Sequence, residues 1–362
     1  MSRIRPGRSS GEPAPDGLAF PAPHPAARLA HLPLNIWLVG QEGLPTQRSG
    51  RYSLASVRGH PGKMLPALAR CLVEEYTCPG DLVLDPMSGI GTVGVEAVRL
   101  GRRYVGVELE APFVAWQQEN LAAARKGGAS GAFVVRQGDA RELAHLFSQE
   151  PSLACPVDAV LTSPPYANRL GHRNGRPSAL LRDLAASKPH HAAFGAGYGT
   201  GPGNIGNLAP TAYLREMEKV YAGCLAILKP GGLLAVVIRP VRVRGRLVPL
   251  HHQTTQLCRE LGFEFLDEVV ACLARVDTGT GPEPRLRAHA LFLRRLAVAR
   301  QRAAGLPVSL EQTEFVLLFR KPVPPEGKPG SEIPSGGRQR VRDKGGRLAA
   351  LAGRDARAPV AG

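Results

Sequence analysis

The stretch LVLDPMSGIGTVG, residues 82–94, joins an apolar run to a glycine-rich turn and to the first residues of an expected helix. Residues 82–85 have the length and apolar composition of a buried strand, and a helix is expected around residues 92–100. Glycine suits the tight connection between them because its backbone reaches conformations that other residues avoid. A strand, a tight turn and a helix in this order predict one βα unit of a parallel sheet.

The same alternation continues along the chain. The expected strands cover residues 82–85, 104–109, 133–139, 158–162, 233–239, 264–276 and 314–321, and the expected helices cover 62–77, 92–100, 111–125, 140–148, 211–228 and 251–261. The last two strands lack an intervening helix, so they are expected to pair antiparallel. Lys229-Pro230-Gly231-Gly232 is expected to end the helix before it, and the apolar segment 34–40 to dock on the domain. The predicted fold class is α/β, with a mostly parallel sheet and helices on both faces.

Composition sets the expected limits of the ordered chain. Residues 1–33 and 322–362 are rich in Pro, Gly and Arg without periodicity, and they are predicted to be disordered tails. The single domain is expected over residues 34–321. Two insertions are expected within it, at about 167–210 and 277–311.

The chain is strongly basic. Its formal net charge is +16 and its pI is about 10.2. Half of the excess charge lies in residues 59–321, so the predicted tails alone do not explain it. A positive electrostatic field of this kind favours polyanionic partners, above all nucleic acid.

The cysteines and the hydropathy of the sequence indicate the cellular compartment in which the protein is expected. The six cysteines form no CxxC pair, which gives no metal-ligand spacing and fits a reducing, cytoplasmic environment. The sequence has no run of about 18 apolar residues, so neither a transmembrane helix nor a membrane partner is expected. The N-terminus lacks the apolar segment of a secretory signal.

The turn after the first strand has the spacing Gly89-x-Gly91-x-x-Gly94, and Glu108 closes the next strand. This is the spacing of a dinucleotide-binding fingerprint, with a carboxylate placed to accept hydrogen bonds from a ribose diol. The pattern fits NAD as readily as any other adenosine cofactor. A plain tight βα turn that uses glycine for backbone freedom is the alternative without a ligand.

Three details argue against a dinucleotide. Asp85 and Pro86 precede the glycines, and an acidic residue there would repel a pyrophosphate while suiting a cation. Asp139 ends the third strand, where its side chain or backbone could reach an adenine amino group. The fourth strand runs into the corner Ser-Pro-Pro-Tyr, residues 163–166. Three carboxylates at successive strand ends suit S-adenosylmethionine, which carries an ammonium and a sulfonium and has no phosphate.

Several segments together resemble the S-adenosylmethionine-dependent methyltransferases of exocyclic amino groups in nucleic-acid bases. The resemblance is strongest to the N4-cytosine/N6-adenine DNA methylases and covers about residues 48–322. The matching segments, in chain order, are GHPGK (59–63), DPMSGIGT (85–92), YVGVELE (104–110), QGDA (137–140), TSPPY (162–166) and EFVLLFRKP (314–322).

The resemblance implies a Rossmann-like methyltransferase fold with a seven-stranded sheet. It assigns GHPGK, Asp85 and the first two glycines to the methionine side of the cofactor, Glu108 to its ribose and Asp139 to its adenine. The expected cofactor-binding residues are His60, Lys63, Asp85, Pro86, Gly89, Gly91, Thr92, Glu108 and Asp139, and the expected catalytic residues are Ser163, Pro164, Pro165 and Tyr166.

The Ser-Pro-Pro-Tyr corner suits methylation of an amine whose lone pair is delocalised into an aromatic ring. Two acceptors on the amino hydrogens would localise that lone pair and stabilise the charge developing on nitrogen, and Ser163 and the carbonyl of Pro164 could supply them. Proline fixes its own φ and restricts the residue before it, so the acceptors are held still. Tyr166 offers a ring face on which an extruded base could stack.

Three basic segments are predicted to contact nucleic acid, with DNA preferred and RNA as an alternative. They are the glycine-rich insertion 167–210, the arginines of 239–246 and the segment 285–302. The third is expected to lie in one helix over 285–304, with Arg287, Arg294, Arg295 and Arg302 along one stripe; a solvated helix face is the alternative.

The leading hypothesis is therefore a DNA amino-methyltransferase. Ser rather than Asp at position 163 favours cytosine N4 over adenine N6 within the family that the chain resembles. An RNA methyltransferase, for example one acting on guanosine N2 of tRNA, is the nearest alternative. An inactive nucleic-acid-binding protein is a more distant one. A dehydrogenase is disfavoured because nothing beyond Glu108 offers a site for hydride transfer.

Overall fold

The computed structural model describes residues 34–60, 62–149, 156–166, 172–173, 176–177, 203–243, 246–277, 285–287 and 292–324. The described chain up to Val323 belongs to one compact unit. The predicted tail 1–33 lies outside the described residues, as do nearly all of 322–362 and most of the insertion 167–210. The boundaries of the domain and its insertions therefore stay predictions.

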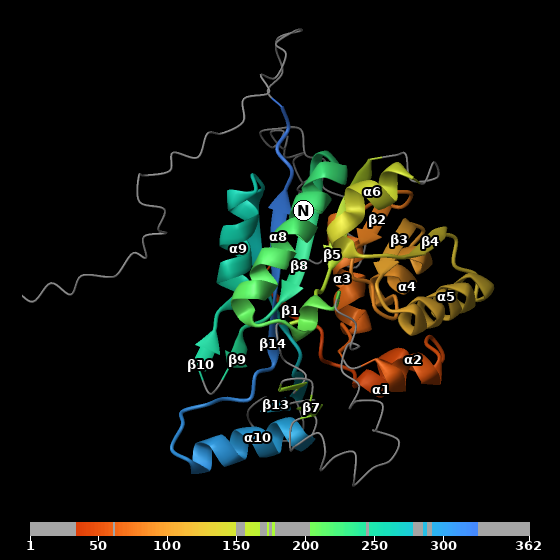
Figure 1. Cartoon of the computed structure of the whole chain (residues 1–362). Coiled ribbons are helices and arrows are strands. Elements are labelled where there is room, and N and C mark those ends of the chain that lie inside the picture. The colour runs from red at the N-terminus through yellow and green to blue at the C-terminus, as the bar shows by residue number, and fades with distance from the viewer. Residues whose placement is uncertain are drawn as a thin grey trace, which may run out of the picture. The chain divides into compact units, whose positions relative to one another are not determined.

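The central sheet has the strand order β1-β11-β14-β8-β5-β2-β3-β4 (Figure 1). Its strands are β1 (Ile36–Leu38), β2 (Leu82–Asp85), β3 (Arg103–Glu108), β4 (Phe133–Gln137), β5 (Val157–Thr162), β8 (Leu228–Ile238), β11 (Glu264–Cys272) and β14 (Thr313–Arg320). Strand β14 is antiparallel to both of its neighbours, and every other pair in the sheet is parallel. The predicted α/β fold is confirmed, including the antiparallel pairing of the last two long strands.

The sheet has one strand more than expected. The segment predicted to dock on the domain forms β1, whose residue Ile36 pairs with Val270 of β11. It adds an eighth strand at one edge. The seven expected strands, from β11 to β4, form the rest of the sheet without interruption.

Helices cover both faces of the sheet. They are α1 (Leu44–Arg48), α2 (Leu54–Gly59), α3 (Pro66–Tyr76), α4 (Thr92–Arg99), α5 (Ala111–Lys126), α6 (Leu143–Ser148), α8 (Pro210–Ile227), α9 (Leu250–Glu260) and α10 (Phe292–Ala303), with the 3-10 turns η2 (Ala140–Glu142) and η5 (Ile205–Asn207). Among the described helices none is long and apolar enough to cross a membrane.

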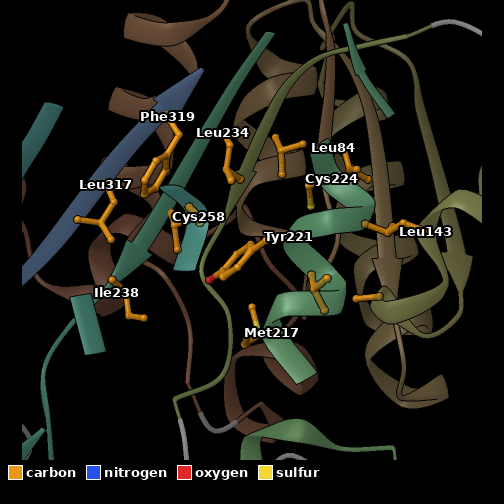
Figure 2. Close-up of a cluster of buried hydrophobic side chains, with 14 of the residues drawn as sticks. Leu84, Leu143, Met217, Tyr221, Cys224, Leu234, Ile238, Cys258, Leu317 and Phe319 are labelled. Carbon is orange, nitrogen blue, oxygen red and sulfur yellow. The ribbon is translucent and has the colours of Figure 1, made fainter. Parts of the chain in front are cut away.

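Two hydrophobic clusters form the core, one on each face of the sheet. Along β8, Leu234 and Ile238 pack into the cluster that includes α6, α8 and α9, while Ala235 and Val237 pack into the cluster that includes α3, α4 and α5. Figure 2 shows the first cluster, in which the side chain of Tyr221 extends from α8 toward Cys258 of α9. Successive residues of a strand point to opposite faces, so continuously apolar strands are those buried on both sides.

Two expected strand boundaries are wrong. The helix ends where expected, since α8 ends at Ile227, but β8 begins at Leu228 rather than at residue 233, so Lys229–Gly232 lies within the strand. Backbone pairing explains this, because the amide of Gly231 donates to the carbonyl of Lys321 and the amide of Lys321 donates to the carbonyl of Gly232. The β-rich run over 264–276 is also divided, since β11 ends at Cys272.

The helix expected over 285–304 is wrong in its first part. Residues Arg285–Arg287 form β13, which pairs antiparallel with β12 (Arg275–Asp277), and an ion pair of 2.5 Å joins Arg287 to Asp277. Helix α10 begins only at Phe292, so Arg287 does not share a helical stripe with the arginines of α10. Two further small hairpins are β9 (Val241–Val243) with β10 (Arg246–Val248), and β6 (His172–Arg173) with β7 (Arg176–Pro177).

Candidate active site

The candidate site lies at the carboxyl ends of β2 and β5. The chain runs from β2 outward through β3 to β4, and from β5 outward through β8 in the other direction. In open parallel sheets, ligands bind where the strand order reverses in this way. Asp85 is the last residue of β2 and Ser163 directly follows β5, so the structure brings the two motifs together at this point.

The glycine turn is held between a helix and a histidine. Gly89 and Gly91 have φ angles of 54° and 79°, in the left-handed region that favours glycine. A Cβ at Gly91 would lie 2.6 Å from Cγ of Gln117, and one at Gly89 would lie 2.9 Å from Nε2 of His60. Both positions therefore need glycine for conformation and for space.

Glu108 braces the same turn from the end of β3. Its buried carboxylate accepts hydrogen bonds from the amide of Gly89 at 2.8 Å and from the amide of Glu110 at 2.9 Å. Burial raises the pKa of Glu108, and these two hydrogen bonds partly oppose the rise. A carboxylate has about four acceptor positions, so Glu108 keeps capacity for a hydroxyl donor of a ligand.

Asp85 is a buried carboxyl that hydrogen-bonds across to the neighbouring strand. Its Oδ1 accepts from Oγ1 of Thr162 at 2.8 Å and from the amide of Met87 at 3.2 Å. Burial raises the pKa of Asp85 to about 7, although the hydrogen bonds from Thr162 and Met87 lower it and the nearby Glu108 raises it. A cation beside Asp85 would therefore find a carboxyl that ionises near neutral pH.

Asp139 differs from the other two carboxylates because it is already paired. Arg141 donates to it from its backbone amide at 2.9 Å and forms an ion pair with it at 2.5 Å. Arg141 also pairs with Glu216 of α8 at 2.6 Å. Burial alone would raise the pKa of Asp139, but the hydrogen bonds from Arg141 outweigh it and lower the pKa. Asp139 is thus an ionised residue fixed at the start of η2.

His60 and Lys63 lie beside the glycine turn. The imidazole of His60 is buried and packs on the ring of Phe113, with centroids 4.5 Å apart. Burial, helped by Lys63 and Arg48, lowers the pKa of His60 to about 3, so its ring is neutral. Burial and Arg48 also lower the pKa of Lys63 to about 7, and its ammonium donates to the backbone carbonyl of His60.

The Ser-Pro-Pro-Tyr corner is largely enclosed. Ser163 and Pro165 are half-buried, Pro164 is buried, and Tyr166 is only 8% exposed. The Tyr166 hydroxyl donates to Oε1 of Glu314 at 3.3 Å, and the guanidinium carbon of Arg239 lies 5.0 Å from the centre of its ring. A guanidinium thus lies over the Tyr166 ring in this structure, and the role of the ring as a stacking surface for a base stays a prediction.

The described basic segments gather at the same edge of the sheet. Arg239 and the β9–β10 hairpin directly follow β8, and the segment containing β13 and α10 connects the end of β11 to the start of β14 (Figure 1). Since β8 and β11 end at the carboxyl edge, both basic segments lie on the side of the candidate site. Most of the third segment, 167–210, lies outside the described residues.

Sequence reasoning missed several residues of the site. Asn204 donates to Oε1 of Glu110 at 3.2 Å, and a Cβ at Gly203 would lie 3.6 Å from Oδ2 of Asp139, so this segment returns to the carboxylates. Thr162 belongs to the quoted TSPPY motif, and its hydroxyl before the corner was the available signal. Glu314 had no signal beyond its place at the start of a strand.

Comparisons with known proteins find similarity to methyltransferases that act on nucleic acids. Residues 28–119 match the family model described as DNA methylase. The chain is similar to a tRNA (guanine(10)-N2)-dimethyltransferase of Methanothermobacter thermautotrophicus, with 34% identity over 137 residues, 38% of this chain and 37% of that protein. It is also similar to the DNA adenine methyltransferase YhdJ of Escherichia coli K12, with 33% identity over 64 residues, 18% of this chain and 22% of that protein.

Among solved structures, TrmN from Thermus thermophilus is similar with 18% identity and a TM-score of 0.37, covering 72% of this chain and 50% of that one. The chain spans less than half the length of the curated relatives that it matches. The family match covers the segment from β1 through the glycine turn and Glu108 into α5. This part of the chain is therefore similar to the N4-cytosine/N6-adenine DNA methylases, a family whose cofactor is S-adenosylmethionine.

Proposed function

We propose that this protein transfers a methyl group from S-adenosylmethionine to the exocyclic amino group of a base in DNA, first of all N4 of cytosine, with N6 of adenine as the second candidate. One observation carries the proposal. The 2.8 Å hydrogen bond between Thr162 and Asp85 joins the end of the catalytic strand to the end of the cofactor strand. A group held by Asp85 and an amine held by the Ser163 corner would therefore be neighbours.

The residues at the strand ends fit the cofactor. The described hydrogen-bond partners of the Asp85 carboxyl are a hydroxyl and an amide, with no cation among them. Asp85 would bind the ammonium of the methionine part, Glu108 the ribose hydroxyls and Asp139 the adenine side. Gly89 and Gly91 let the backbone approach closely, and His60 and Lys63 would line the methionine end beside them. When bound, S-adenosylmethionine supplies a methyl group activated by a sulfonium.

The corner would orient the target amine. The Ser163 hydroxyl and the Pro164 carbonyl accept its two N–H groups, which directs the lone pair and stabilises positive charge on nitrogen. Pro164 and Pro165 have no amide hydrogen that could compete for these acceptors. Positioning of this kind can lower a barrier by about 7–11 kcal/mol. No general base is needed, because the nitrogen becomes positively charged when it takes up the methyl group, and this acidic cation then releases a proton.

DNA is the preferred substrate class because of the family match and the net charge of +16. We expect the segments 167–210, 239–246 and 285–302 to contact phosphates, which gives affinity without sequence specificity. Ser163 in place of Asp favours cytosine. The similarity to a tRNA guanine-N2 dimethyltransferase over 137 residues makes guanosine N2 of tRNA the second candidate function.

The test is product analysis. The protein is incubated with S-adenosylmethionine and separate pools of unmethylated DNA and tRNA, which are then digested and examined for methylated nucleosides by mass spectrometry. N4-methylcytosine or N6-methyladenine in DNA supports the proposal, and N2-methylguanosine in tRNA replaces it with the second candidate. The variant Ser163→Ala should lower kcat by about 10²- to 10³-fold while cofactor affinity measured by calorimetry is kept. Absence of all three nucleosides with the natural chain overturns the proposal.

A further inference from the structure

Arg239 and Glu314 both contact Tyr166, the last residue of the proposed catalytic corner. The guanidinium of Arg239 lies over the Tyr166 ring, 5.0 Å from its centre, and Glu314 accepts the hydrogen bond of the Tyr166 hydroxyl. Nε of Arg239 is buried and has no hydrogen-bond partner among the described residues. A planar cation with an unused donor thus lies next to the corner that is proposed to hold the target amine.

Strand pairing fixes where this cation can act. Strands β5 and β8 are parallel neighbours, with Thr162 paired to Val236. The corner after β5 and Arg239 after β8 therefore leave the sheet at the same edge. Glu314 contacts the hydroxyl end of the Tyr166 ring, which is the end farther from the backbone of the corner. Arg239 is accordingly the charged side chain placed over the ring itself.

A base stacked on the covered face of Tyr166 would enter the layer that the guanidinium now occupies. Such a base would displace the guanidinium from the ring, and the displaced N–H groups could then meet the edge of the base. A planar guanidinium binds best to two adjacent acceptors in its own plane. Arginine reads guanine in the major groove by this same bidentate geometry.

Only one candidate base offers two adjacent acceptors beside its amine. In cytosine, N3 and O2 follow the amino-bearing carbon along one edge. Adenine offers N1 followed by a C–H group. Guanine offers N1–H on one side of its amine and the single acceptor N3 on the other. The edge that matches a guanidinium is therefore that of cytosine.

We propose that Arg239 is a specificity-determining residue, whose guanidinium leaves the Tyr166 ring and binds N3 and O2 of an extruded cytosine while the Ser163 corner holds its N4. This inference rests on the proposed amino-methyltransferase function and narrows its substrate. The lost hydrogen bonds to a charged group predict a decrease in kcat/KM for cytosine on the order of 10- to 100-fold in Arg239→Ala. Arg239→Lys should recover only part of it, because an ammonium lacks the planar pair of donors.

The experiment compares the natural chain with Arg239→Ala and Arg239→Lys on unmethylated DNA, with N4-methylcytosine and N6-methyladenine quantified separately. Arg103→Ala, which removes one charge at the opposite end of the sheet, is the matched control. The proposal expects cytosine methylation to fall and the adenine-to-cytosine ratio to rise only in the Arg239 variants. Cofactor affinity and thermal melting, measured in parallel, should stay at the level of the natural chain.

A chemical cycle then tests the contact itself. Once the methylated site is known, its target cytosine is replaced by 3-deazacytosine, which carries C–H in place of N3. The natural chain should be less active on 3-deazacytosine than on cytosine. Arg239→Ala, which already lacks the contact, should show little further decrease in activity when cytosine is replaced by 3-deazacytosine. If the substitution of Arg239 and the substitution of the base lower activity independently, so that the two decreases multiply, the proposal is overturned and a phosphate contact is indicated. An equal decrease in cytosine and adenine methylation, or a lower melting temperature in both Arg239 variants, would also overturn it.

The outcomes also separate the inference from the proposed function. If the natural chain methylates only adenine N6 or guanine N2, amino methylation stands and the role of Arg239 is overturned. If the natural chain methylates no amino group in either nucleic acid, the proposed function fails and the inference fails with it.

Discussion

Asp85 should make cofactor affinity depend on pH. Burial raises its pKa to about 7, so it is largely neutral below that value and ionised above it. An ammonium ligand binds the ionised form, so affinity for S-adenosylmethionine should decrease as the pH falls below about 7, approaching about tenfold per pH unit. Calorimetric titrations between pH 5.5 and 8.5 measure this. Affinity that does not change over that range would contradict the proposed role of Asp85.

The matched control is Asp85→Asn, which should bind weakly throughout and lose most of the pH dependence. It also separates Asp85 from Lys63, whose pKa is lowered to about 7 by burial and by Arg48. A pH dependence that persists in Asp85→Asn would assign the titration to Lys63.

Thr162 should tune the same titration. Its hydrogen bond lowers the pKa of Asp85 against the effect of burial. Thr162→Val keeps the shape and removes the donor, so the pKa of Asp85 should rise and the midpoint of the affinity profile should move to higher pH. Thr162→Ser keeps the hydroxyl and should leave the midpoint in place. A midpoint that does not differ between Val and Ser would show that Asp85 is not the titrating group.

The positions of several candidate site residues could be predicted from the local sequence, but their contacts could not. Asp85, Glu108 and Asp139 each stand at or just after a strand end that can be recognised locally, and all three lie at the carboxyl edge. The contacts of Arg239 and Glu314 with Tyr166 join three segments far apart in the chain. Only the packing of β5, β8 and β14 brings them together, so local sequence patterns carry no signal for these contacts.

At the scale of elements, the turn before α4 depends on glycine for two reasons. Gly91 has a φ of 79°, and a Cβ there would meet the side chain of Gln117 at 2.6 Å. Gly91→Ala should therefore lower the free energy of unfolding by more than the roughly 1–2 kcal/mol of a left-handed residue alone, and it should weaken cofactor binding. Chemical denaturation and calorimetry measure the two effects.

Gly128 provides the comparison for that variant. It has a φ of 91°, and nothing lies within 4 Å of a Cβ built there. Gly128→Ala should cost only the conformational part, with cofactor affinity unchanged. Equal losses of stability in the two variants would mean that the contact with Gln117 relaxes without cost.

Regular elements with strong periodicity were predictable to within a few residues, as α5 and β3 show. The errors lie where tertiary pairing overrides local preference. Residues Arg285–Arg287 lie in a strand because β12 pairs with them and Asp277 pairs with Arg287. The segment Ile36–Leu38 forms a strand because it pairs with β11. Three residues carry too little pattern to predict a partner so distant in sequence.

At the scale of the whole molecule, charge at the carboxyl edge should govern nucleic-acid affinity. Arg285 of β13 and Arg300 of α10 are exposed on the segment that lies at this edge. The double variant Arg285→Gln/Arg300→Gln should weaken DNA binding. It should also reduce the slope of log K against log salt by about 2, since each phosphate contact contributes about 0.9. Fluorescence anisotropy at several salt concentrations gives the slope.

Arg103 and Arg125 allow a control with the same change in net charge. Arg103 begins β3, and Arg125 lies in the last turn of α5, which returns to the start of β4 at the opposite edge. Changing both to glutamine should leave the slope nearly unchanged. Equal slopes in the two double variants would show that net charge acts without a defined binding edge.

The pairing of Ile36 with Val270 has a consequence for how the chain assembles. Among the described strands, β1 is synthesised first, and its partner β11 follows only after β2, β3, β4, β5 and β8 of the same sheet have been made. Contacts this distant in sequence slow folding because a large loop must close before they form. Strand β1 is thus made early and placed late, and until then the edge of β11 is open to pairing with other chains.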